Sequence, residues 1–163
     1  MLSFFLLGIG LSILAYFLWD LIHETSHLLV AHFMVGVRKW SMKLWPHYDQ
    51  GALRWGAVEY WPERAVSSKE EVCILLAPRI PNLLSVLAFP FSAALSGQEF
   101  IVWGVLWGAG LVDLLVGSLG ISPTSDLRLA SHYMKCSPWL LRVLGMILIF
   151  TSVGTMVTWK LFH

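Results

Sequence analysis

Four long apolar segments constrain this chain more than any other feature of its sequence. They cover residues 2–37, 71–95, 100–119 and 139–162. About 20 apolar residues are enough to cross the hydrocarbon core of a bilayer. Because lipid offers the backbone no hydrogen-bond partners, each segment is expected to be a helix. The second segment is expected to be kinked or partly unwound, because it contains Pro78, Pro81 and Pro90.

The composition is typical of a multi-pass membrane protein. Of the 163 residues, 57% are hydrophobic and 13% are charged. A net charge of +1 and the lack of a basic run argue against a nucleic-acid partner. The two cysteines, Cys73 and Cys136, form no C-x-x-C pattern and predict neither a disulfide framework nor a thiolate metal site. We expect a single transmembrane domain over residues 1–163, with the first segment retained as a helix.

Residues 38–70 differ from the segments around them. Charged residues, glycines and prolines appear, and residues 40–45 and 52–61 favour β-strands with a turn at 49–51. The tryptophans of this region are typical of a membrane interface. The sequence therefore predicts an all-α polytopic membrane protein with about four transmembrane helices and a small β-hairpin at the cytoplasmic membrane surface.

Basic residues set the expected orientation in the membrane. They concentrate in the connections after the first and third segments, at Arg38, Lys39, Lys43, Arg54, Arg64, Lys69, Arg128 and Lys135. The opposite side has Lys160 near the C-terminus. The positive-inside rule then places both connections in the cytoplasm and both termini outside. Within the second connection, a short helix is expected at 127–135, capped by Thr124 or Ser125.

An H-E-x-x-H pattern, His23-Glu24-Thr25-Ser26-His27, lies inside the first apolar segment. On a helix the two histidines are one turn apart on one face and can hold one zinc ion, while Glu24 can reach a water at the metal. Asp20 lies one turn earlier on that face, whereas His32 projects from nearly the opposite side. A chance recurrence is the competing interpretation. A central charge in a membrane helix costs about 2.5–3.5 kcal/mol, which favours a functional zinc site.

A catalytic zinc site usually has three protein ligands, so one more is expected. The remaining candidates are Asp126, Asp113, His132 and Asp20. Asp126 follows a proline-containing turn and precedes a helix, where it can also serve as an N-cap. Asp113 lies within the third segment, where it can instead accept a hydrogen bond from a ligand histidine or pair with Arg79. Spacing alone leaves the choice between these two aspartates open.

Three stretches resemble motifs of one known family. Residues 23–31, His-Glu-Thr-Ser-His-Leu-Leu-Val-Ala, are similar to H-E-x-x-H-x-x-x-A; residues 77–82, Ala-Pro-Arg-Ile-Pro-Asn, to A-G-P-x-x-N; and residues 123–126, Pro-Thr-Ser-Asp, to a proline-to-D-G motif. These motifs and their order resemble the site-2 protease family of intramembrane zinc metalloproteases, of which the chain would be a minimal member. It departs from the family pattern at Pro78, Arg79, Ser118 and Leu127.

The resemblance implies a role for each matching residue. His23, His27 and Asp126 would be the zinc ligands, Glu24 the general base and Asn82 a contact to an extended substrate. It thereby favours Asp126 over Asp113 as the third ligand.

The expected function is hydrolysis of peptide bonds in membrane-embedded substrates by a zinc-activated water. An open edge of the hairpin can hold an unwound substrate by strand addition. Arg79 is expected to stabilise the oxyanion, to pair with Asp113 or to extend to the interface. The expected partners are a transmembrane protein or peptide and the lipid bilayer. Two alternatives remain: a non-catalytic membrane chaperone or binding protein that keeps the metal site, and a zinc hydrolase acting on a lipid or small molecule.

Overall fold

The computed structural model describes residues 2–49, 52–54, 56–95, 97–119 and 125–162. Its helices are α1 (Leu2–Val35), α2 (Ser68–Leu76), α3 (Arg79–Ala88), the 3₁₀ helix η1 (Phe89–Ala94), α4 (Gly97–Leu119), α5 (Asp126–Met134) and α6 (Pro138–Phe162). Four helical stretches are long and apolar enough to cross a membrane: Leu6–Val35, Ser68–Ala94, Gly97–Leu119 and Pro138–Phe162. This confirms the predicted fold class and is compatible with an integral membrane protein.

The prolines divide the second membrane segment as expected. Helix α2 ends at Leu76, and Pro78 occupies the N-cap position of α3. Pro81 lies in the first turn of α3, where the backbone N–H that proline lacks has no helical partner. Pro90 falls at the start of η1, where the helix tightens to 3₁₀ geometry. The break between α2 and α3 matters for the site, because it orients Arg79 and Asn82 into the bundle.

The hairpin consists of two short antiparallel ladders. Strand β1 (Val37–Lys43) pairs with β4 (Ala57–Pro62), and β2 (His47–Asp49) pairs with β3 (Ala52–Arg54). The second predicted strand, 52–61, is thus divided into two. Lys43 lies opposite Ala57 whereas His47 lies opposite Arg54, so the register shifts by one residue between the ladders. Of the predicted turn at 49–51, Gln50 and Gly51 lie outside the described residues.

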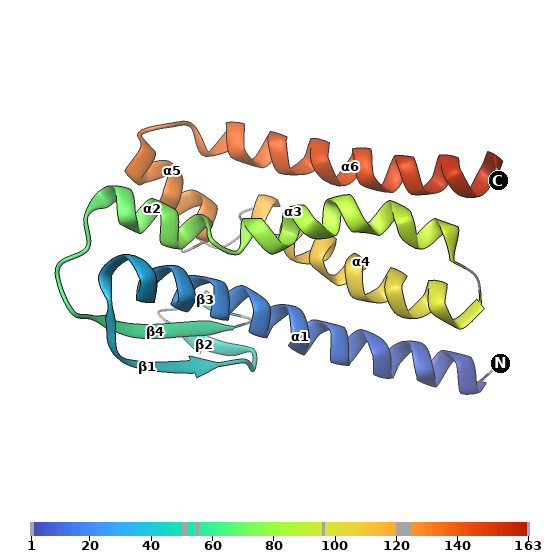
Figure 1. Cartoon of the computed structure of the whole chain (residues 1–163), viewed down its shortest axis with the longest axis horizontal. Coiled ribbons are helices and arrows are strands. Elements are labelled where there is room, and N and C mark those ends of the chain that lie inside the picture. Colours follow the sequence, from blue (N-terminus) through green and yellow to red (C-terminus); the bar gives the residue numbers. More distant parts are fainter. Residues whose placement is uncertain (1, 50–51, 55, 96, 120–124, 163) are drawn as a thin grey trace.

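The hairpin packs along α1. Gly36, with φ of 71°, turns the chain from α1 into β1, a conformation that glycine adopts without steric cost. Tyr60 of β4 packs against the buried residues Ala31, Val35 and Ile74. Figure 1 shows the hairpin, α2 and α5 at one end of the molecule, with both chain termini at the other. The hairpin, α2 and α5 therefore lie at the same end of the helices, and the side of the membrane that this end faces stays a prediction.

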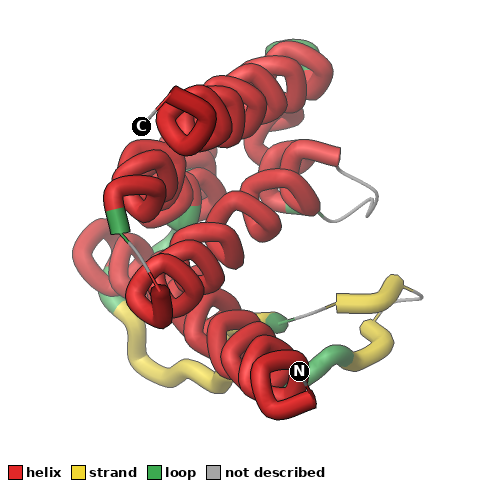
Figure 2. Tube along the Cα trace, turned by 90° about the vertical axis from the view of Figure 1, so that its right-hand side faces the viewer, coloured by secondary structure: helices red, strands yellow, loops and turns green. Residues whose placement is uncertain are grey.

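Close approaches between the helices depend on small residues, as is common in membrane proteins. A Cβ at Gly110 would clash with the Ser85 hydroxyl and come within 2.8 Å of Trp19 Cη2. A Cβ at Gly145 would clash with the hydroxyl of Ser118. The apolar core between α3, α4 and α6 contains Val86, Leu111, Leu114 and Ile149. Seen from the end, the helices run side by side, and the strands lie on either side of α1 (Figure 2).

Candidate metal centre

Three side chains from two elements converge to form a candidate metal centre, which we define as His23, His27 and Asp126. One atom of each that could ligate a metal lies within 4.8 Å of the others. Asp126 Oδ2 lies 3.0 Å from His23 Nε2 and 3.4 Å from His27 Nε2. Zinc bonds of about 2.0–2.1 Å in a tetrahedral site place neighbouring ligand atoms about 3.3 Å apart. Both nitrogen–oxygen distances therefore fit a shared tetrahedral ion.

Asp126 reaches the centre because it is the first residue of α5. Ser125 occupies the N-cap position, as one of the two predicted caps, but its side chain makes no capping hydrogen bond. Asp126 is therefore not the cap of this helix, which was the alternative role for it. The other predicted cap, Thr124, lies outside the described residues, as does Pro123 of the proline-to-aspartate motif.

Each histidine of the centre is held through its other ring nitrogen. His27 Nδ1 donates to the backbone carbonyl of Ile74 over 2.7 Å. His23 Nδ1 donates to the Asp113 carboxylate, 3.1 Å from Oδ2 and 3.2 Å from Oδ1. Because a carbonyl and a carboxylate only accept, both Nδ1 atoms must carry a proton. Such outer hydrogen bonds fix the tautomer and orientation of metal-binding histidines.

This protonation pattern gives the centre an electrostatic problem that a cation would solve. A neutral imidazole protonated at Nδ1 presents a lone pair at Nε2. Both lone pairs then face the carboxylate oxygen of Asp126, which is also an acceptor. Either both rings carry a second proton, or a cation lies between the three acceptors. The side chains of His23, His27 and Asp126 are only 15%, 10% and 21% exposed, so water does little to screen this repulsion.

Asp126 itself is held as an ionised carboxylate. Burial favours its neutral form, but when both rings carry a second proton, hydrogen bonds and positive charge from His23 and His27 outweigh burial and hold the pKa of Asp126 well below its usual range. An ionised carboxylate is the form that ligates metals.

The other predicted site residues surround the centre without joining it. Glu24 is buried, 7% exposed, and lies on α1 next to His23. Asn82 is fully buried, and its Nδ2 donates to Asp113 Oδ2 over 2.8 Å. Asp113 therefore supports His23 and is itself supported by α3. Contact between Asn82 and a substrate stays a prediction.

Asp20 and His132 lie outside the group of three ligands. The Asp20 carboxylate packs directly against Gly56, where a Cβ would clash with it. Its Oδ2 is buried without a hydrogen-bond partner among the described residues. His132 is exposed near the end of α5. Of the candidates for a third ligand, the geometry brings Asp126 to both histidines and Asp113 to the far side of one.

Two contributors were missed by reading the sequence for reactive side chains. The Ile74 carbonyl is a backbone group that any residue would provide. Gly117 lies against the guanidinium of Arg79, and a Cβ there would approach both terminal nitrogens to 2.7 Å. A faint signal for Gly117 existed, because it follows Asp113 by four residues and so shares its helix face.

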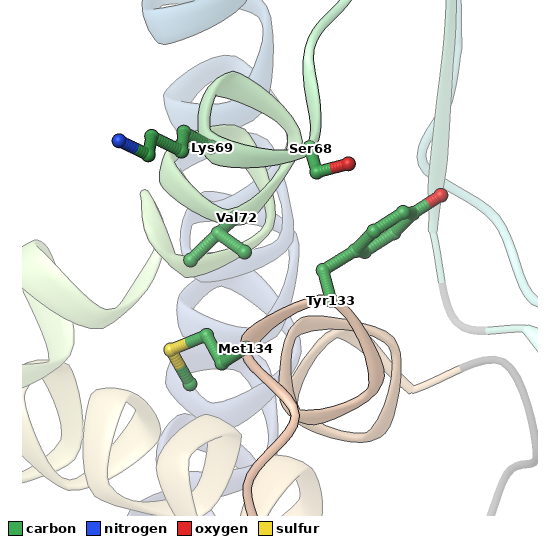
Figure 3. Close-up of a pocket in the computed structure, with 5 residues that line it drawn as sticks. All are labelled: Ser68, Lys69, Val72, Tyr133 and Met134. Atoms are coloured by element: carbon green, nitrogen blue, oxygen red, sulfur yellow. The ribbon is translucent and has the colours of Figure 1, made fainter.

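A separate pocket of about 210 Å³ lies between α2 and α5 (Figure 3). It is lined by Ser68, Lys69, Val72, Tyr133 and Met134. Figure 3 shows Val72 and Met134 facing each other across it while Lys69 points away. None of the metal-centre side chains lines this pocket, so we do not assign it to the site.

No protein-family model, curated protein or solved structure matches this chain. Its function must therefore be argued from the chemistry of the site.

Proposed function

We propose that the chain is an intramembrane zinc metallopeptidase that cleaves membrane-embedded peptide segments, with zinc held by His23, His27 and Asp126. The observation that carries this proposal is the convergence of two histidine Nε2 atoms and one carboxylate oxygen in a largely buried site. The motif resemblance to site-2 proteases supports the same ligands.

The reaction divides between the metal and the side chains of the chain. A zinc ion in this site would supply a Lewis acid that acidifies water and polarises a carbonyl group. Glu24 takes a proton from the attacking water at its carboxylate and delivers it to the leaving amine. Asp113 and the Ile74 carbonyl keep the two imidazoles oriented throughout. Burial of the site excludes bulk water, which strengthens these electrostatic interactions.

The hairpin is the proposed holder of the substrate. A transmembrane helix must unwind before its amides can be cleaved, because its backbone is otherwise fully hydrogen bonded. Within the described residues, β1 and β4 pair only with each other, so each retains an edge. An extended substrate would add to such an edge through backbone hydrogen bonds. We further propose that this end of the molecule faces the cytoplasm, following the distribution of basic residues.

The test measures zinc content and peptide cleavage on the same preparations. Purified protein in proteoliposomes should contain about one zinc per chain and cleave a synthetic transmembrane peptide. Glu24→Gln should keep the zinc and lose at least about 100-fold in rate, the range of general-base contributions. The double variant His23→Ala with His27→Ala should lose zinc and activity together. His32→Ala, at an exposed position on the same helix, is the matched control and should change neither.

Two outcomes would reject the proposal in different ways. Full zinc occupancy in the double histidine variant would remove the site assignment. A zinc-loaded wild type that cleaves a lipid ester but no peptide would reassign the substrate, and one that cleaves neither would support a binding role.

A further inference from the structure

Arg79 contacts both carboxylates of the site. It is the first residue of α3, and its side chain is only 13% exposed. Its Nη2 donates to Asp126 Oδ2 over 3.5 Å, and its Nη1 lies 3.9 Å from Asp113 Oδ2. One cation thus connects the proposed metal ligand with the residue that orients His23. The metal ion must approach the same carboxylate oxygen, Asp126 Oδ2.

The surroundings of Arg79 keep its charge at this position. The guanidinium lies directly over Gly117 of α4, where a side chain would displace it. Its Nε and Nη1 are buried and have no hydrogen-bond partner among the described residues. The N-terminal end of a helix is also an unfavourable place for a cation, because the helix dipole is positive there. Within the described part of the chain, the carboxylates of Asp113 and Asp126 are the groups that compensate for burying this charge.

These contacts have opposite consequences before and after metal binding. Without metal, Asp113 and Asp126 are two partly buried negative charges, and Arg79 stabilises their arrangement. With metal, the guanidinium would lie close to a divalent cation held by the same Asp126 carboxylate. The two cations then repel each other and compete for the same negative charge.

We propose that Arg79 is a built-in counter-cation of the metal centre: it preassembles the metal-free site and, in return, weakens metal binding. The inference rests on the zinc site of the proposed function. It makes Arg79 a positioning residue that acts through Asp113 and Asp126. The site remains folded when the metal leaves, so metal can exchange without unfolding the bundle.

Thermodynamic linkage ties these two effects to one number. Suppose that replacing Arg79 tightens zinc binding by some factor. The replacement must then increase the unfolding equilibrium constant of the metal-free form by that same factor more than it increases that of the zinc-loaded form. A residue with a purely structural role would weaken zinc binding when replaced. The direction of the change therefore separates the two roles, independently of any enzymatic activity.

The experiment measures zinc affinity by competition with a chromophoric chelator and thermal unfolding with and without zinc. Arg79→Gln should bind zinc at least about fivefold more tightly, the lower end of typical coupling between two sites. Its unfolding temperature should fall more in the metal-free form than in the zinc-loaded form. Arg79→Lys keeps the charge and should stay near the wild-type affinity.

Two glycine variants provide a matched pair on α4. Gly117→Ala pushes the guanidinium away from the carboxylates and should tighten zinc binding, though less than Arg79→Gln. Gly104→Ala is the control, because a Cβ there has no neighbour within 4 Å. If Arg79→Gln folds only with zinc, that result supports the proposal. If Arg79→Gln folds neither with nor without zinc, the zinc affinity of Gly117→Ala tests the proposal instead.

Unchanged or weaker zinc binding in Arg79→Gln, with normal binding in the wild type, would overturn this inference and leave the proposed function intact. A wild type that binds no zinc would instead remove the metal centre and, with it, both proposals.

Discussion

The two aspartates near His23 should differ sharply in what their loss does to zinc. Asp126 supplies an oxygen to the metal centre, whereas Asp113 contacts His23 through Nδ1, on the side away from the metal. Asp126→Ala leaves two ligands, one fewer than catalytic zinc sites use. Asp113→Asn keeps an oxygen that accepts from His23 but removes the negative charge. We therefore expect the first variant to lose stoichiometric zinc and the second to retain it.

The structure sets the size of the Asp113 effect. In Asp113→Asn the new amide would face the Asn82 amide that now donates over 2.8 Å. Rotating the Asn82 amide solves this, because its Oδ1 has no partner among the described residues. The packing is thus preserved and only the charge on the hydrogen-bond acceptor changes. Loss of an outer partner of a metal-binding histidine costs about 10–100-fold in affinity, or about 1.4–2.7 kcal/mol.

The assay is chelator competition for zinc at equal folded yield, with yield checked by thermal unfolding. Glu99→Gln is the control, because Glu99 is an exposed carboxylate at the start of the same helix as Asp113. It should leave zinc affinity unchanged. Zinc lost from Asp113→Asn but kept in Asp126→Ala would refute the reasoning and exchange the roles of the two residues.

Three further predictions concern the packing, the topology and the metal. Gly110→Ala should lower the free energy of unfolding by about 1–3 kcal/mol, because its Cβ would overlap Ser85 and Trp19, while Gly104→Ala should cost nothing; thermal unfolding of the pair tests this. Tyr48→Cys, at a position 81% exposed on β2, should resist an impermeant thiol reagent on intact cells once both native cysteines are serine. Strong labelling would reverse the topology. Chelation should lower the unfolding temperature, since zinc at about 100 times its Kd contributes about 2.7 kcal/mol; equal temperatures would contradict specific binding.

The sequence by itself determined the membrane helices and two of the three residues of the candidate centre. Apolar length predicts helices in lipid because no other backbone conformation satisfies its hydrogen bonds there. Helix geometry then places His23 and His27 one turn apart, since the positions of residues four apart in a helix are fixed by its pitch. The breaks near Pro78 and Pro90 were also predictable, because proline lacks the N–H that continues a helix.

Only the tertiary structure decided which groups meet those histidines. Asp126 and Asp113 are 103 and 90 residues away from His23, and spacing alone could not rank them. The register shift that divides the predicted strand 52–61 into β3 and β4 could not be predicted either, because it depends on pairing between the two sides of the hairpin. The Ile74 carbonyl is a backbone group, so the identity of residue 74 does not predict its contact with His27. The proposed role of Arg79 depends on its contacts with Gly117, Asp113 and Asp126. The physical reason is the same in each case: packing between helices fixes these contacts, and a sequence read along the chain reports only its local interactions.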